Sequence, residues 1–161
     1  MKIAINGFGR IGRQVLRIGL NYPELEFVAI NDLTDAKTLA HLFKYDTIYR
    51  TFNGDVSVDG NNLVVNGRKI PVFSEKEPEK LPWKSLNVDV VVEATGKFTK
   101  QEDAQKHITA GAKKVLITAP GKGNNVKLIV KGVNEHTYNK EKDVIISNAS
   151  CTTNCLAPIV K

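Results

Sequence analysis

The chain has no apolar run that approaches the roughly 18 residues of a membrane-spanning helix. Its start, MKIAINGFG, contains too short an apolar stretch for a secretory signal, and glycines interrupt that stretch at once. We therefore expect a cytoplasmic protein without a membrane partner.

Cysteine and histidine are scarce, since there are only two cysteines and three histidines. Cys151 and Cys155 are one helical turn apart, and a disulfide across one turn would be strained and would close almost no loop. A metal site needs about four ligands, and no second Cys/His cluster exists. We expect free thiols in a reducing compartment and no metal.

Long runs of one charge are also missing. The net charge is +6, from 23 Lys and Arg against 17 Asp and Glu, and the basic residues are scattered along the chain. This distribution favours a solvated surface, so nucleic acid is not expected as a partner. A length of 161 residues is about that of one domain, and the sequence has no internal repeat.

Short apolar strands alternate with single helices along the chain. Helical spacing of apolar residues predicts helices over 10–20, 34–45 and 99–111. Asp-Gly and Asn-Gly turns predict hairpins between 56 and 73. Apolar strands are expected at 2–6, 27–32, 87–96, 114–120, 127–132 and 143–148. This order is typical of a doubly wound α/β domain with a mostly parallel sheet covered on both faces.

Local signals predict where two of the helices begin and end. Thr34 is expected to cap the helix over 34–45, with Leu42 on its buried face. TKQE at 99–102 has the form of a capping box, and Gly111 is expected to end the helix that this box begins.

A glycine-rich turn follows the first strand. NGFGRIG at 6–12 contains G-x-G-x-x-G between a strand and a helix, the context in which this pattern binds dinucleotides. Gly7 is expected to allow the tight turn, Gly9 to let a pyrophosphate approach the backbone, and Gly12 to let the helix pack against its strand. The alternative is a structural strand–turn–helix unit without a ligand.

An anion site and an acid complete this pattern. The amides of Arg10 and Ile11 lie at the helix N-terminus, which attracts phosphate. Asp32 follows the second strand, 20 residues beyond Gly12, where a carboxylate accepts hydrogen bonds from both ribose hydroxyls. A carboxylate repels a 2′-phosphate, so we expect NAD rather than NADP as the cofactor.

Two later strands end in small polar residues, at Thr95-Gly96 and at Thr118. Because the carboxyl ends of parallel strands line the ligand crevice, Thr95, Gly96 and Thr118 are expected to face the dinucleotide. The alternative for each is that it only closes a loop.

The last cysteine motif suits a nucleophile. Ser150 is expected to cap the final helix, which places Cys151 in the first turn, where the helix dipole stabilises a thiolate by about 0.3–1 kcal/mol. That is too little to ionise a thiol at pH 7, so a basic partner is needed. His41, His107 and His136 are all expected at the surface, and none has an obvious path to Cys151.

Four segments together resemble the phosphorylating glyceraldehyde-3-phosphate dehydrogenases: NGFGRIGR, Asn31-Asp32-Leu33, EATG at 93–96 and ASCTTNC at 149–155. The resemblance covers the whole chain but only the first half of the family. It implies an NAD-binding Rossmann domain over 1–149 and the first helix of a truncated catalytic domain over 150–161.

The resemblance also assigns cofactor contacts. It implies that the amides of Arg10 and Ile11 bind the diphosphate and that Asp32 holds the adenosine ribose. Lys76 takes a loop position at the adenine end, and Thr118 contacts the nicotinamide side. The Leu33 that follows the acid resembles the NAD-specific members.

The implied reaction belongs to glycolysis. Cys151 adds to the aldehyde of glyceraldehyde 3-phosphate, with Ser150 and Thr152 lining the substrate site. The thiohemiacetal that forms passes a hydride to nicotinamide and becomes a thioester, which inorganic phosphate cleaves to 1,3-bisphosphoglycerate. The family forms homotetramers, and its histidine base belongs to the catalytic domain, beyond Lys161. The chain alone is therefore expected to bind NAD without efficient turnover.

Two other interpretations remain open at this point. The motifs of this half do not separate glyceraldehyde-3-phosphate from erythrose-4-phosphate dehydrogenase. A stand-alone NAD-binding or interaction module that uses its basic surface on RNA is the third possibility, although no basic and aromatic platform is visible.

Overall fold

The computed structural model describes all residues, 1–161. The helices are α1 (Arg10–Gly19), α2 (Ala36–Lys44), α3 (Gln101–Thr109) and α4 (Cys151–Val160), with short 3-10 helices η1 (Pro78–Lys80) and η2 (Glu135–Thr137). The strands are β1 (Lys2–Asn6), β2 (Glu26–Asn31), β3 (Tyr45–Asp46), β4 (Arg50–Thr51), β5 (Val56–Asp59), β6 (Asn62–Val65), β7 (Arg68–Phe73), β8 (Val90–Glu93), β9 (Lys114–Ile117), β10 (Val126–Leu128) and β11 (Ile145–Ser147).

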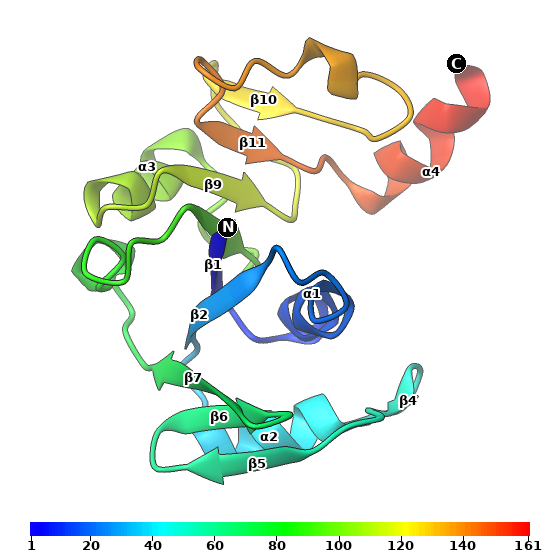
Figure 1. Cartoon of the computed structure of the whole chain (residues 1–161). Coiled ribbons are helices and arrows are strands. Elements are labelled where there is room, and N and C mark those ends of the chain that lie inside the picture. The colour runs from blue at the N-terminus through cyan, green and yellow to red at the C-terminus, as the bar shows by residue number, and fades with distance from the viewer.

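Nine of these strands form one sheet, in the order β10-β11-β9-β8-β1-β2-β7-β6-β5 (Figure 1). All pairs from β10 to β7 are parallel, whereas β5, β6 and β7 form an antiparallel meander. The mostly parallel α/β sheet that the sequence predicts is therefore confirmed, as are the hairpins between 56 and 73.

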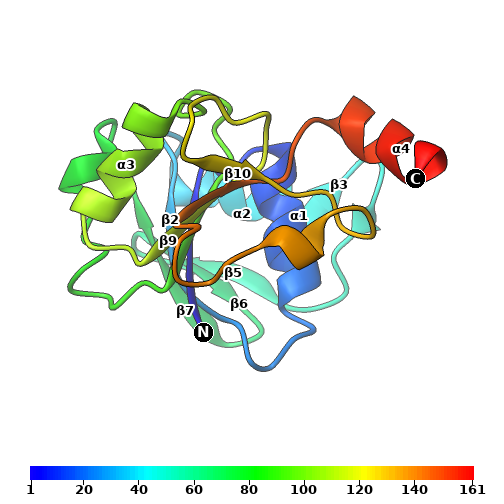
Figure 2. The ribbon, with the colours of Figure 1, turned by 90° about the horizontal axis from the view of Figure 1, so that it is seen from above.

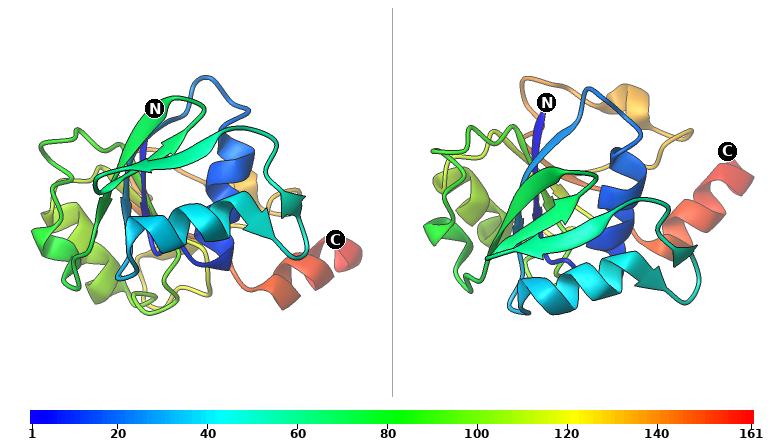
Figure 3. Two further views of the ribbon diagram at one scale, coloured as in Figure 1. Left: turned by 90° about the horizontal axis from the view of Figure 1, so that it is seen from below. Right: turned by 60° about the horizontal axis from the view of Figure 1, so that its bottom comes forward.

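The central connections place helices on opposite faces of the sheet. The chain passes from β1 through α1 to β2 in one direction, and from β8 through α3 to β9 in the other. Because such crossovers are right-handed, α1 and α3 lie on opposite faces (Figures 1 and 2). The order reverses between β1 and β8, and ligands of open α/β sheets bind beyond the carboxyl ends of strands at such a point. On the α1 side, α2 packs along β5 and β6 (Figure 3).

One part of the sheet is left uncovered by helices. The connection from β9 to β11 contains no α-helix, and an apolar groove of about 780 Å³ lies beside α1 over β8, β9 and β11. Ile11 and Ile18 line this groove and are 52% and 59% exposed. The expectation of a sheet covered on both faces is thus wrong for this region. None of the four α-helices has the length and apolar character that a membrane crossing requires.

The expected start of α2 is wrong by one residue. Asp35 is the N-cap and accepts a hydrogen bond from the Thr38 amide (2.9 Å). Thr34 lies one residue before the cap, in the preceding turn, where its amide donates to the Asp32 carboxylate (2.9 Å). Leu42 is 38% exposed rather than buried.

The expected capping box of α3 is also wrong. The helix begins at Gln101 after Lys100, and no side chain caps it. The reason is tertiary, since the Gln101 amide donates to the Lys122 carbonyl (2.8 Å) and the Thr99 carbonyl accepts from the Lys122 amide (2.9 Å). The end at Gly111 is confirmed, with the glycine at φ +105°.

Candidate functional site

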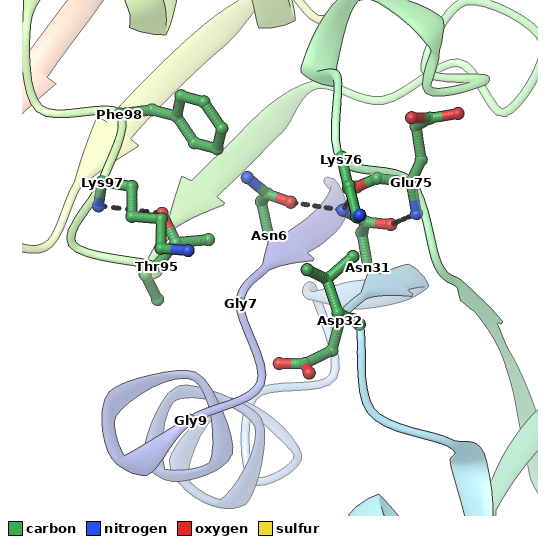
Figure 4. Close-up of a pocket in the computed structure, with 12 residues that line it drawn as sticks. Asn6, Gly7, Gly9, Asn31, Asp32, Glu75, Lys76, Thr95, Lys97 and Phe98 are labelled. Atoms are coloured by element: carbon green, nitrogen blue, oxygen red, sulfur yellow. Dashed lines mark hydrogen bonds between the residues drawn. The ribbon is translucent and has the colours of Figure 1, made fainter.

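A pocket of about 600 Å³ opens at the carboxyl ends of β1, β2 and β8 (Figure 4). Of the residues named from the sequence, it brings together the glycine turn, the acid after β2, the loop lysine and the threonine after β8. Its lining consists of Asn6, Gly7, Gly9, Asn31, Asp32, Leu33, Glu75, Lys76, Ala94, Thr95, Lys97 and Phe98.

The glycines of the turn have different structural reasons. Gly7 has φ +90°, and a Cβ there would lie 2.7 Å from the Thr95 nitrogen. A Cβ on Gly12 would overlap the Gly7 carbonyl oxygen, so only glycine allows α1 to lie this close to the turn. A Cβ on Gly9 would meet nothing within 4 Å, which leaves the backbone there open to a ligand.

The N-terminus of α1 keeps its amides free. Gly9 is the N-cap, and no side chain caps the helix. The Arg10 side chain points to Asp46, with 3.0 Å between Nη1 and Oδ2. The backbone amides of Arg10 and Ile11, rather than the guanidinium, are therefore the groups available to an anion beside Gly9.

Asp46 links this helix start to the β3–β4 hairpin. The pKa of Asp46 lies below its ordinary value, chiefly because its carboxylate accepts a hydrogen bond from the Tyr49 amide. The Ile48 amide and the charge of Arg10 lower this pKa further. A lowered pKa stabilises the fold above the ordinary value of about 3.9, and this stabilisation is lost as the pH falls through the folded-state value. We expect Asp46→Asn to lower the melting temperature by a few degrees at pH 7.

The difference between Asp46→Asn and the wild type should shrink steadily below pH 4, as the wild-type carboxyl becomes protonated. Thermal unfolding followed by circular dichroism between pH 3 and pH 7 measures both melting temperatures. A difference that stays constant over this range would show that the charge of Asp46 does not contribute.

Asp32 lies half-buried at the end of β2, with its carboxylate beside the glycine turn (Figure 4). Its Oδ2 accepts from the Phe8 amide (2.7 Å) and its Oδ1 from the Thr34 amide (2.9 Å). The carboxylate therefore holds the glycine turn in place and also faces the pocket. The sequence pattern did not reveal the first of these two roles. Each oxygen keeps lone pairs for further donors.

Sequence reasoning missed several lining residues. Two short loops form opposite walls of the pocket, Glu75–Lys76 on one side and Thr95–Phe98 on the other (Figure 4). The asparagines Asn6 and Asn31 lie buried between these walls. The available signal was a polar residue as the last member of an apolar strand, in KIAIN and EFVAIN.

Some residues named from the sequence lie outside this lining. Gly96 is exposed, with φ +72°, in the turn after Thr95. Thr118 donates from its amide (3.0 Å) and from its hydroxyl (3.1 Å) to the Glu93 carbonyl. Thr118 thus lies at the end of β9, next to the end of β8.

The cysteine lies at the start of α4. Ser150 is the N-cap, as expected, and its hydroxyl accepts from the Thr153 amide (2.9 Å). Cys151 and Thr152, in the first turn, are exposed, and Cys151 and Cys155 are both free thiols. Neither Cys151 nor its neighbours line the pocket. Ala149 turns the chain into the helix at φ +57°, a left-handed conformation that costs about 1–2 kcal/mol for a residue with a Cβ.

The expectation that all three histidines are at the surface is wrong for His107. It is fully buried in α3, with Nδ1 3.0 Å from the Trp83 indole nitrogen and Nε2 3.0 Å from Glu93 Oε2. A histidine held on both nitrogens inside the protein is not a base for Cys151. His41 and His136 are exposed. No three potential metal-ligating side chains gather anywhere in the chain.

Comparison with known proteins shows which family this sequence is similar to. Residues 1–101 match the family model described as "Glyceraldehyde 3-phosphate dehydrogenase, NAD binding domain". Glyceraldehyde-3-phosphate dehydrogenase of Geobacillus stearothermophilus is 58% identical over 161 residues, which is all of this chain and 48% of the relative. That of Clostridium acetobutylicum is 59% identical over 160 residues, which is 99% of this chain and 47% of the relative.

The chain thus spans about half the length of the curated relatives it matches. The matched region contains the glycine turn, Asp32, both pocket walls and the residues between them. This chain therefore belongs to the glyceraldehyde-3-phosphate dehydrogenase family, and it carries that family's NAD-binding domain.

Proposed function

We propose that this chain is the cofactor half of a cytoplasmic glycolytic enzyme that oxidises and phosphorylates glyceraldehyde 3-phosphate, and that its pocket holds NAD. The observation that carries the proposal is the pocket itself. Gly9, whose backbone is open, and Asp32 line it, and the uncapped N-terminus of α1 begins directly after Gly9, in a chain whose family binds NAD.

Each group has a distinct task in this proposal. The amides of Arg10 and Ile11 bind the diphosphate, Gly7 allows the tight turn, and Gly9 lets the diphosphate approach the backbone. Asp32 accepts from the ribose hydroxyls of the adenosine.

Four further residues are assigned to the dinucleotide: Lys76 and Thr95, which line the pocket, and Gly96 and Thr118, which lie outside its lining. Lys76 lies at its adenine end, Thr95 and Gly96 face the dinucleotide, and Thr118 contacts the nicotinamide side. When bound, NAD supplies the acceptor for the hydride of the substrate.

Cys151 is the proposed nucleophile. Its thiolate adds to the aldehyde carbon, and the acyl group is then held on sulfur as a thioester that inorganic phosphate cleaves to an acyl phosphate. Ser150 and Thr152 line the substrate site. We assign 1–149 to the NAD-binding domain and 150–161 to the first helix of the catalytic domain, whose remainder supplies the base.

The proposed partners are this catalytic domain, glyceraldehyde 3-phosphate and inorganic phosphate, in a homotetramer without nucleic acid or membrane contacts. Calorimetric titration of the folded chain with NAD tests the proposal directly. We expect one site per chain and little acyl-phosphate production until a separately made catalytic half is added. Absence of NAD binding in a folded sample would refute the proposal.

The two thiols provide a second test. Cys151 lies in the first turn of α4 and Cys155 one turn later, so the helix dipole favours the Cys151 thiolate by about 0.3–1 kcal/mol. We therefore expect iodoacetamide to alkylate Cys151 about two to five times faster than Cys155 at pH 7. Peptide mass spectrometry over a time course gives both rates. Equal rates, or faster labelling of Cys155, would contradict the assignment of the nucleophile.

A further inference from the structure

A chain of buried hydrogen bonds runs beneath the pocket, across the carboxyl ends of β8, β1 and β2. Asn6, Asn31, Glu93 and His107 are each at most 5% exposed. The Asn31 amide group donates to Asn6 Oδ1 (2.7 Å), and Asn6 Nδ2 donates to Glu93 Oε2 (2.6 Å). Figure 4 shows the two asparagines lying between the pocket walls.

Both ends of this chain reach a wall of the pocket. At one end the Glu75 amide donates to Asn31 Oδ1 (2.8 Å), while Asn31 Nδ2 donates to the Glu75 carbonyl (2.9 Å). At the other end Glu93 Oε1 accepts from the amide of Thr95 (2.8 Å) and also from its hydroxyl. One network therefore holds Glu75 and Thr95 on opposite walls.

The direction of every bond follows from backbone groups that cannot be reversed. Glu75 presents both an N–H and a C=O to Asn31, which sets the orientation of the Asn31 amide. The NH₂ of Asn31 then faces Asn6, so Asn6 must turn its oxygen to Asn31 and its NH₂ to Glu93. At the far end the Thr95 N–H also requires an acceptor.

His107 is a third group whose donor and acceptor roles in the network are fixed. The Trp83 indole donates only, so His107 Nδ1 must accept, and Nε2–H then donates to Glu93 Oε2. Four donors thus converge on the Glu93 carboxylate: Asn6, His107 and two from Thr95. Only a side chain that accepts at both oxygens satisfies them all.

We propose that Glu93 is a positioning residue for NAD binding, whose buried carboxylate holds the two walls of the pocket in register through Thr95 and through Asn6 and Asn31. The inference rests on the proposed function, because it assigns the pocket to NAD. Glu93 itself does not line the pocket.

Glu93→Gln tests the proposal with a nearly unchanged shape. The NH₂ of glutamine must face either the Thr95 amide or the donors on Asn6 and His107. In either case an N–H of the glutamine faces another N–H instead of an acceptor. We expect the Kd for NAD to rise about tenfold or more, measured by calorimetry on the folded variant. We also expect the amide resonance of Thr95 to shift in the NMR spectrum without ligand.

A compensating double variant makes the test specific to polarity. In Asn6→Asp with Glu93→Gln, the glutamine NH₂ donates to the carboxylate introduced at position 6, and the glutamine oxygen accepts from Thr95. His107 Nε2 lies 3.4 Å from Asn6 Nδ2, so it too can donate to a carboxylate at position 6. The donors on Asn31, Thr95 and His107 thus again have acceptors. We expect the double variant to bind NAD more tightly than Glu93→Gln, whereas Asn6→Asp alone places two carboxylates together and binds worst.

Ile145→Ala is the matched control for lost stability, since Ile145 is a buried residue of β11 outside the pocket. It should lower the melting temperature and leave the Kd for NAD unchanged. Equal affinities of Glu93→Gln and Ile145→Ala would overturn the proposal. So would a double variant no better than Glu93→Gln.

Two further outcomes are decisive as well. If Glu93→Gln does not fold, a folded double variant that binds NAD supports the proposal, and an unfolded one overturns it. If the wild type binds no NAD, the proposed function fails instead. The ¹⁵N shifts of the His107 ring then still report whether Nε2 carries the proton, as this network requires.

Discussion

Gly12→Ala is expected to weaken NAD binding at least a hundredfold and to destabilise the domain. A Cβ at this position would overlap the Gly7 carbonyl oxygen and would lie 3.1 Å from Ile5 Cγ2. The first of these contacts is with backbone, so α1 must move away from β1. Overpacking of this kind costs about 1–3 kcal/mol of folding free energy. The helix shift also moves the amides of Arg10 and Ile11, so we expect NAD affinity to fall at least a hundredfold.

Gly9→Ala separates the two effects of Gly12→Ala. The backbone of Gly9 has φ −72°, and a Cβ there would meet nothing within 4 Å, so alanine fits the protein without NAD. The same Cβ would occupy the place where the diphosphate approaches the turn. We expect an unchanged melting temperature with NAD affinity lowered at least tenfold. Thermal unfolding and calorimetry on both variants measure these quantities. Gly12→Ala with wild-type affinity would show that the turn does not set the anion site.

The sequence predicted those parts of this site that depend on local rules. The glycine turn and the Ser150 cap each follow from steric or hydrogen-bonding needs within a few residues of chain, and the acid follows from its usual spacing of about 20 residues after the turn. The parallel sheet follows in the same way from apolar strands that alternate with helices. Such features require no knowledge of which distant segments meet.

Features that depend on distant contacts were missed. The Thr99 capping box gives way to backbone pairing with Lys122, and His107 is buried because Trp83 and Glu93 meet it from other elements. The open groove beside α1 follows from a connection that lacks a helix, and apolar spacing within α1 does not reveal that absence. Polar residues at the last position of apolar strands were the available signal for Asn6 and Asn31.

Substitution of Asp32 is expected to change the choice between NAD and NADP. A 2′-phosphate near this carboxylate meets like charge, and two unit charges 4 Å apart interact by about 1 kcal/mol in water and about 4 kcal/mol near a protein surface. The wild type should therefore bind NADP at least tenfold more weakly than NAD. In Asp32→Ala this ratio should fall to about threefold or less.

Asp32→Ala removes the acceptor of the ribose hydroxyls, and also that of the Phe8 and Thr34 amides. The absolute NAD affinity should therefore fall about 10- to 100-fold, the usual loss for a hydrogen bond to a charged group. Asp32→Asn isolates the charge, because its amide oxygen still accepts from one of the two amides. We expect this variant to lose most of the discrimination between NAD and NADP while it keeps more of the NAD affinity than Asp32→Ala. Competition titrations with both cofactors on the three proteins give the ratios. If Asp32→Asn keeps the wild-type preference for NAD, the preference comes from the shape of the turn and not from the negative charge at its edge.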